Sequence, residues 1–124
     1  MTDKRDLVIL GGGLVGMTLA LAAAKKGITS HVIDKALPEE LTAEGVDGRA
    51  SAISTASWNL FCNIGLEERL APLGCPIEAI AVTDGMKPGR IDFKPQPGDG
   101  TLGRMYANRD IRLALFEAAR GQSA

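Results

Sequence analysis

Three glycines near the N-terminus, Gly11, Gly13 and Gly16, occupy the glycine places of the pattern G-x-G-x-x-G. Between a strand and a helix, the first glycine allows a tight turn and the second lets a pyrophosphate approach bare backbone. The third lets helix and strand pack closely. Backbone N–H groups at the helix start, around Leu14 and Val15, then face the phosphates with the positive end of the helix dipole behind them. The spacing therefore predicts a phosphate-binding turn.

The flanking residues supply the elements that this turn requires. Leu7 to Leu10 is an apolar run typical of a buried parallel strand, 14–26 reads as a helix closed by Gly27, and Ser30 to Ile33 reads as a second strand. An acidic residue about 20 positions after the glycines, at the end of that strand, can accept hydrogen bonds from a ribose. Asp34 stands there. The four features together predict a dinucleotide-binding βαβ unit.

Three other interpretations of this stretch are open. Leu7 to Ala24 carries no charge and follows Lys4 and Arg5, so it could be a signal peptide or a marginal membrane span. Consecutive glycines, at roughly 1 kcal/mol each relative to alanine, argue against a continuous helix, and a signal peptide leaves Asp34 unexplained. A nicotinamide-dependent Rossmann dehydrogenase would need further βαβ units after Asp34, which the later sequence does not supply.

The composition favours one soluble globular domain. The chain has 124 residues, 45% of them hydrophobic and 23% charged, with a formal charge of −1. This balance gives no electrostatic reason to expect nucleic acid as a partner. Cys62 and Cys75 form neither a disulfide framework nor a zinc pattern, so a reducing cytoplasm is expected. We find no metal-spaced cluster, paired carboxylates or nucleophile–base pair, and we interpret His31 as a structural residue. Any chemistry must therefore come from a cofactor.

The rest of the chain predicts an α/β fold that changes from parallel to antiparallel pairing. A solvated connection with one helical turn follows Asp34, and Asn108 is expected to cap a final helix buried through Ile111, Leu115 and Ala118 or Ala119. Between them we expect short helices and then extended segments; the helices are 56–63 and 66–73, and the extended segments are 76–84, 90–94 and 102–107.

Two arginine positions could reach an anion. Arg49 lies among small residues shortly before a helix start at Ser54 or Thr55, where its fork of donors could reach a phosphate. Arg109 and Arg112 share a face in the first turn of the final helix, where cations oppose the helix dipole. Simple solvent exposure is the alternative for all three, and for Arg49 it is the interpretation that the residues alone favour.

Four segments together resemble the N-terminal part of the FAD-dependent aromatic hydroxylases of ubiquinone biosynthesis, in the same class as para-hydroxybenzoate hydroxylase. They are Asp6 to Ala22, His31 to Asp34, Asp47 to Ser54, and Asn108 to Leu115. The likeness extends from Asp6 to about Arg120. The glycine unit is common to many flavoproteins, whereas the third and fourth segments together are more particular to this class.

The resemblance implies a role for each matching residue. Gly11, Gly13 and Gly16 would hold the FAD pyrophosphate, and Asp34 would bind the adenosine ribose. Lys35 would lie near the adenine. Arg49 would reach the FAD phosphates from the loop before the second helix, and Arg109 would touch the ribityl side of the flavin.

The resemblance also implies an activity and a domain plan. Family members reduce FAD with NAD(P)H, use dioxygen and hydroxylate a phenolic ring, so a phenolic or polyprenylphenol substrate is expected. Residues 1–75 would form the FAD-binding region, 76–107 the start of a β-rich substrate region, and 108–124 a helix returning to the FAD region. Because the substrates are lipid-bound, peripheral contact with the inner membrane is a further expectation.

Family members are much longer, and no second Gly-Asp segment with a helix behind it follows Arg109. The chain is therefore expected to be an N-terminal fragment that does not turn over alone. Two competing hypotheses are a different flavin oxidoreductase or amine oxidase that shares only the glycine unit, and a truncated chain that is either a non-catalytic interaction module or an unfolded remnant.

Overall fold

The computed structural model describes residues 3–45 and 47–122. Its first unit is the strand–helix–strand arrangement that the glycine pattern predicts: β1 (Leu7–Leu10), α1 (Leu14–Lys25) and β2 (Ser30–Ile33). β1 and β2 pair in parallel, with Leu7 opposite Ser30. α1 ends where Gly27 adopts φ +76°, a left-handed conformation that glycine reaches without strain. The Rossmann-like βαβ unit is confirmed.

The middle of the chain is helical except for one strand. The elements are α2 (Pro38–Thr42), β3 (Ala50–Ser54), α3 (Thr55–Asn63), α4 (Glu67–Leu70) and the 3-10 turn η1 (Ala71–Leu73). The Ser54 side chain accepts a hydrogen bond from the backbone N–H of Ser57, so it caps α3 as the sequence predicts. β3 is a finding of the structure, because the sequence suggested only small residues before a helix.

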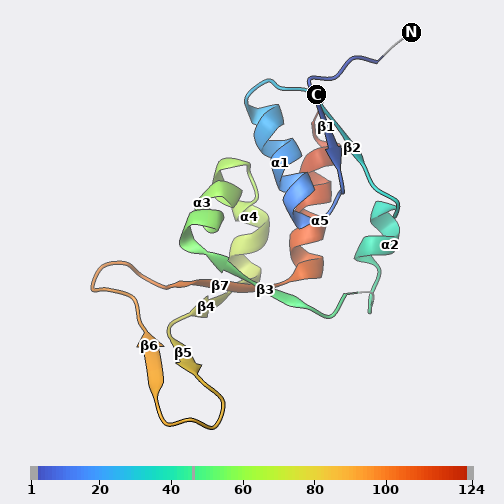
Figure 1. The fold of residues 1–124 in the computed structure, drawn as a ribbon. Coiled ribbons are helices and arrows are strands. Elements are labelled where there is room, and N and C mark those ends of the chain that lie inside the picture. The colour runs from blue at the N-terminus through green and yellow to red at the C-terminus, as the bar shows by residue number, and fades with distance from the viewer. Residues whose placement is uncertain (1–2, 46, 123–124) are drawn as a thin grey trace.

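The last third of the chain contains four strands and the final helix. They are β4 (Cys75–Ile77), β5 (Ile80–Thr83), β6 (Arg90–Phe93), β7 (Gly103–Ala107) and α5 (Asn108–Arg120). β7 lies between β3 and β4 in an antiparallel sheet, and β5 and β6 form a separate two-stranded sheet. The hairpin of β5 and β6 projects away from the other elements (Figure 1). Antiparallel pairing after the parallel unit is thus confirmed.

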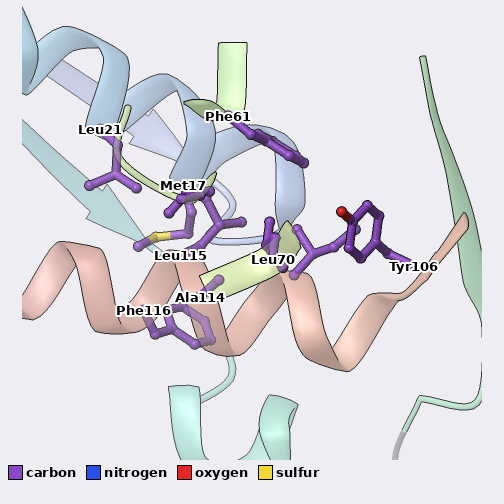
Figure 2. Close-up of a cluster of buried hydrophobic side chains, with 10 residues drawn as sticks. Met17, Leu21, Phe61, Leu70, Tyr106, Ala114, Leu115 and Phe116 are labelled. Atoms are coloured by element: carbon purple, nitrogen blue, oxygen red, sulfur yellow. The ribbon is translucent and has the colours of Figure 1, made fainter. Parts of the chain in front are cut away.

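The core lies between α1 and α5, which pack side by side (Figure 1). Leu21 from α1, Leu70 from α4, Leu115 from α5 and Tyr106 from β7 belong to this one cluster, in which Leu21 and Tyr106 lie far apart (Figure 2). The spacing of Ile111, Ala114, Leu115 and Ala118 places them on one face of α5, and the first three are buried. This face attaches the C-terminal helix to the N-terminal unit, although the two are distant in the sequence.

Two details of the sequence interpretation are wrong. Asn108 does not cap α5: the cap position is Ala107, and Asn108 is the first helical residue, with 6% of its surface exposed. The expected strand 76–84 is two strands with different partners, β4 on β7 and β5 on β6. The sequence missed this division because strand pairing depends on contacts with distant segments, which a local pattern does not contain. The predicted division into regions ending at 75 and 107 stays a prediction.

Within the described residues, no helix combines the length and the apolar character needed to cross a membrane. The uncharged stretch that suggested a span is instead divided between β1, a glycine turn and α1. The membrane-span interpretation of these residues is therefore wrong.

Candidate functional site

The glycine turn leaves the first turn of α1 open. Gly11 has φ +106°, and its N–H donates to the Ile33 carbonyl at 2.8 Å, which fixes the turn against the end of β2. Gly13 occupies the cap position with extended backbone and makes no side-chain cap bond. The first N–H groups of a helix have no carbonyl partner within the helix. Those of Leu14 and Val15 are therefore available to an anion, in a position that the helix dipole favours.

Gly13 and Gly16 are required for different reasons. A Cβ at Gly16 would lie 1.9 Å from the Gly11 carbonyl oxygen and 3.3 Å from the Ile9 side chain. A Cβ at Gly13 would have no atom within 4 Å, and the backbone there has φ −79°, which any residue can adopt. Packing therefore explains Gly16, whereas the space beside Gly13 is open. A phosphate fits this arrangement, because it could reach the bare backbone there.

Asp34 closes the other side of the turn. Its Oδ2 accepts a hydrogen bond from the Gly12 N–H at 2.7 Å, and its Oδ1 accepts one from the Ala36 N–H at 2.9 Å. The Ala36 bond first, and the Gly12 bond second, lower the pKa of Asp34 below its ordinary value. A carboxylate oxygen can accept more than one bond, so both oxygens can still receive hydroxyl groups of a ligand. Lys35 is exposed beside it.

Two hollows flank this arrangement. One, of about 440 Å³, lies between the turn, α2 and α5 and is lined by Gly12, Asp34, Leu37 and Phe116 among others. The other, of about 470 Å³, is mostly apolar and joins the start of α1 to β3 and α5; its lining includes Leu14, Val15, Ser51, Phe61 and Ile111. The start of α1 therefore shares a cavity with the segment that follows Arg49.

Arg49 lies in the loop before β3 and forms an ion pair with Asp47. Its Nε donates to Asp47 Oδ1 at 2.9 Å and its Nη2 to Asp47 Oδ2 at 3.2 Å, while 76% of the Arg49 side chain is exposed. The sequence interpretation placed Arg49 before a helix, and the intervening strand β3 corrects this. The sequence interpretation also gave Asp47 no role of its own. The pattern Asp-x-Arg was the one sequence signal for the Asp47–Arg49 pair, and it is weak unless the contacts from α5 are known.

The arginines of α5 both have partners inside the protein. Arg109 Nε donates to the carbonyl oxygen of Thr42, the last residue of α2, at 2.7 Å. Arg112 Nη1 lies 2.5 Å from Asp47 Oδ2, and only 12% of its side chain is exposed. Solvent exposure is therefore the wrong interpretation for Arg112. Arg109 keeps the N–H groups of its terminal nitrogens, which can still donate to a ligand.

The geometry described so far defines a dinucleotide-binding βαβ protein, and the family follows from comparison with known proteins. The chain belongs to a family described as "FAD binding domain", whose model matches residues 4–123. Over 111 residues it is 44% identical to a "Ubiquinone hydroxylase UbiL" of Rhodospirillum rubrum, covering 90% of this chain and 26% of that protein. Over 121 residues it is 38% identical to a "3-demethoxyubiquinol 3-hydroxylase" of Escherichia coli, covering 95% and 31%. The chain thus spans less than a third of the length of these relatives.

Solved structures agree on the fold. The chain is similar to the flavin-dependent monooxygenase PieE in complex with FAD and substrate, with a TM-score of 0.65 and 16% identity over 97% of this chain and 23% of that one. It is also similar to CtdE in complex with FAD, with a TM-score of 0.61 and 19% identity over 95% and 28%. The expected α/β fold class and the expected family are confirmed, and FAD is the cofactor of this family.

Proposed function

We propose that the glycine turn and Asp34 bind FAD. The open backbone at Gly13, with the N–H groups of Leu14 and Val15, would hold the pyrophosphate, and Gly11 and Gly16 would shape the turn. Asp34 would accept the hydroxyl groups of the adenosine ribose. The observation that carries this proposal is the 2.7 Å bond from the Gly12 N–H to Asp34 Oδ2, because the carboxylate then lies directly beside the glycine turn.

We assign the remaining predicted residues to three parts of the cofactor. Lys35 is next to Asp34 and would lie near the adenine. Arg49 would reach the phosphates, and its exposed guanidinium supports this assignment. Arg109 would contact the ribityl side of the flavin with the N–H groups that its bond to Thr42 leaves free.

For the whole protein we propose hydroxylation of a phenolic ring in a ubiquinone precursor, with NAD(P)H and dioxygen as co-substrates. The support is the sequence identity to the ubiquinone hydroxylase of Rhodospirillum rubrum and the 3-demethoxyubiquinol 3-hydroxylase of Escherichia coli. Bound FAD would take electrons from NAD(P)H and activate dioxygen, while the protein orients the ring and excludes water. Because the chain spans less than a third of these relatives, we expect it to bind FAD only weakly and not to turn over alone.

FAD titration of the protein encoded by the complete reading frame, with the 124-residue chain measured beside it, tests the proposal. We expect the longer protein to be yellow and to bind FAD stoichiometrically, with quenched or shifted flavin fluorescence. Absence of flavin binding by the longer protein would reject the assignment. Far-UV circular dichroism of the short chain, with a cooperative melt in the absence of FAD, would show that it is a folded module and not a remnant.

Oxygen consumption separates the proposed hydroxylase from other flavin enzymes. The longer protein should consume dioxygen with NADPH in a manner that depends on an added polyprenylphenol. An amine oxidase that shares only the glycine unit would instead consume dioxygen with an amine and without NADPH. We also propose peripheral contact with the inner membrane, which flotation with lipid vesicles would test.

A further inference from the structure

Asp47 is the centre of a cluster that the proposed cofactor contacts do not explain. Its side chain is only 6% exposed and accepts hydrogen bonds on both oxygens. Arg49 contributes a backbone N–H at 3.1 Å and its Nε at 2.9 Å to Oδ1. Arg49 Nη2, Arg112 Nη1 and Asn108 Nδ2 surround Oδ2 at 3.2, 2.5 and 3.5 Å. Two bonds from the Arg49 side chain and backbone, and a further one from Arg112, hold the pKa of Asp47 well below its usual range.

The two arginines of the cluster differ in exposure. Arg112 projects from α5 and is 12% exposed, so it serves as a fixed anchor, whereas Arg49 is 76% exposed. Asp47 connects them and is shielded from solvent. One carboxylate and two guanidinium groups leave a net charge of +1, and Arg49 is the arginine that is exposed. The cluster therefore presents one oriented cation at the surface.

Asp47 holds Arg49 by one edge only. Its oxygens take the Nε hydrogen and one Nη2 hydrogen, so both Nη1 hydrogens and the second Nη2 hydrogen of the guanidinium remain to donate. This remaining edge is the one that can form paired bonds to a phosphate. The ion pair thus fixes the direction of the Arg49 guanidinium and leaves three of its N–H groups free to bind a ligand.

The backbone around Arg49 is fixed by the same end of α5. The Asn108 N–H donates to the Arg49 carbonyl at 3.0 Å, and Ser51 Oγ donates to Asn108 Oδ1 at 2.5 Å. Residues two apart in extended backbone share a side, so Arg49 and Ser51 lie on one side of this segment. Ser51 lines the cavity that also contains Leu14 and Val15. Arg49 is therefore held beside a segment that lines the cavity at the start of α1.

We propose that Asp47 is a positioning residue that orients the Arg49 guanidinium toward the FAD phosphates before the cofactor binds. The proposal rests on the FAD assignment given above. An arginine side chain that is free in solution loses rotamer freedom when a ligand immobilises it. With Asp47 in place that ordering has already occurred, so FAD binding is stronger. The opposite hypothesis is that Asp47 competes with the phosphates for Arg49, and it predicts tighter binding once the carboxylate is removed.

A double-mutant cycle on FAD affinity decides between the two. The longer protein would carry Asp47→Asn, which keeps the shape and one acceptor, Arg49→Met, and both changes together. We expect Asp47→Asn to weaken FAD binding about five-fold, and to have at most a small effect when Arg49 is already Met. Arg49→Lys should bind FAD as weakly as Arg49→Met, because an ammonium group cannot form the two parallel bonds of a guanidinium. Unchanged or tighter binding by Asp47→Asn, or an equal effect in both Arg49 backgrounds, would overturn the proposal.

A measurement without FAD separates this inference from the cofactor assignment. The Nε–H signal of Arg49 in nitrogen-15 NMR should show an ordered side chain in the free protein and a mobile one in Asp47→Asn. If Arg49 is mobile in both proteins, the positioning role fails while FAD binding by the unsubstituted protein can still stand. If that protein binds no FAD, the cofactor assignment fails, and the proposal that rests on it fails too. Should Asp47→Asn not fold, Arg112→Lys provides a second route, because it keeps both charges but weakens the contact that holds Asp47 in place. It should make Arg49 more mobile and weaken FAD binding, as Asp47→Asn would.

Discussion

A methyl group on Gly16 would lie 1.9 Å from the carbonyl oxygen of Gly11. Gly16 and Gly11 are therefore in contact. Because Gly16 has no side chain, α1 can start directly against the turn that Gly11 makes. Gly13, between them, has no such neighbour, since a methyl group there would have no atom within 4 Å. We therefore expect folding to depend on Gly16 and ligand binding to depend on Gly13.

Gly16→Ala and Gly13→Ala should separate these two roles. We expect Gly16→Ala to lower the melting temperature, because α1 or the turn must move away from the contact. Gly13→Ala should melt within about 2 °C of the unsubstituted chain but bind FAD at least about ten-fold more weakly, since its methyl group occupies the space proposed for the phosphate. Thermal denaturation and FAD titration of both variants make the comparison. Equal FAD affinity in Gly13→Ala would contradict the proposed phosphate position.

Asp34→Asn should weaken FAD binding more than it affects the fold. The amide can still accept one bond from Gly12 or Ala36, but it loses the charge that strengthens bonds from ribose hydroxyl groups. We expect FAD affinity to fall about ten-fold or more, measured by calorimetric titration. Asp84→Asn is the matched control, because Asp84 is 82% exposed and forms an ion pair with Lys87 in the β5–β6 hairpin. An equal loss in both variants would point to a general charge effect.

Acid should remove the stabilising contribution of Asp6. Its Oδ2 accepts bonds from the Thr29 N–H at 2.9 Å and the Thr29 hydroxyl at 2.8 Å, and these lower the pKa of Asp6. The contribution is present above the ordinary aspartate pKa of about 3.9 and is lost as the pH falls through the lower folded value. The difference in melting temperature between the unsubstituted chain and Asp6→Asn should therefore be largest near pH 7 and should shrink below about pH 4. A difference that stays constant from pH 7 to pH 3 would exclude this role.

Tyr106→Phe should leave stability unchanged or raise it. Tyr106 is 1% exposed and stacks on Trp58 with ring centroids 5.9 Å apart. Its hydroxyl has no hydrogen-bond partner among the described residues. Burying this group costs desolvation free energy that no hydrogen bond offsets, and the phenylalanine avoids that cost. Tyr106→Ala, by contrast, should cost about 3–5 kcal/mol through the cavity it leaves. Urea denaturation of both variants measures the difference. A clear loss of stability in Tyr106→Phe would indicate a partner for the hydroxyl.

The sequence alone determined the first unit and its place in a family. The strand, the glycine turn, the helix and the carboxylate of Asp34 all lie within about 30 consecutive residues, and each depends on local backbone preferences and on short-range periodicity. Nothing distant has to be known to place Asp34 at the end of β2. For the same reason the caps at Gly27 and Ser54 were predicted correctly.

Only the tertiary structure decided which residues meet from distant parts of the chain. Asp47 lies 65 residues before Arg112, and Thr42 lies 67 residues before Arg109. β7 joins β3 to β4, although the sequence suggested only small residues before a helix where β3 lies, and one continuous strand over 76–84. Such contacts depend on the burial of α5 against α1, which a local pattern does not encode. The physical reason is that pairing and burial are settled by competition among all surfaces of the folded chain, whereas turns and caps are settled by their own few residues.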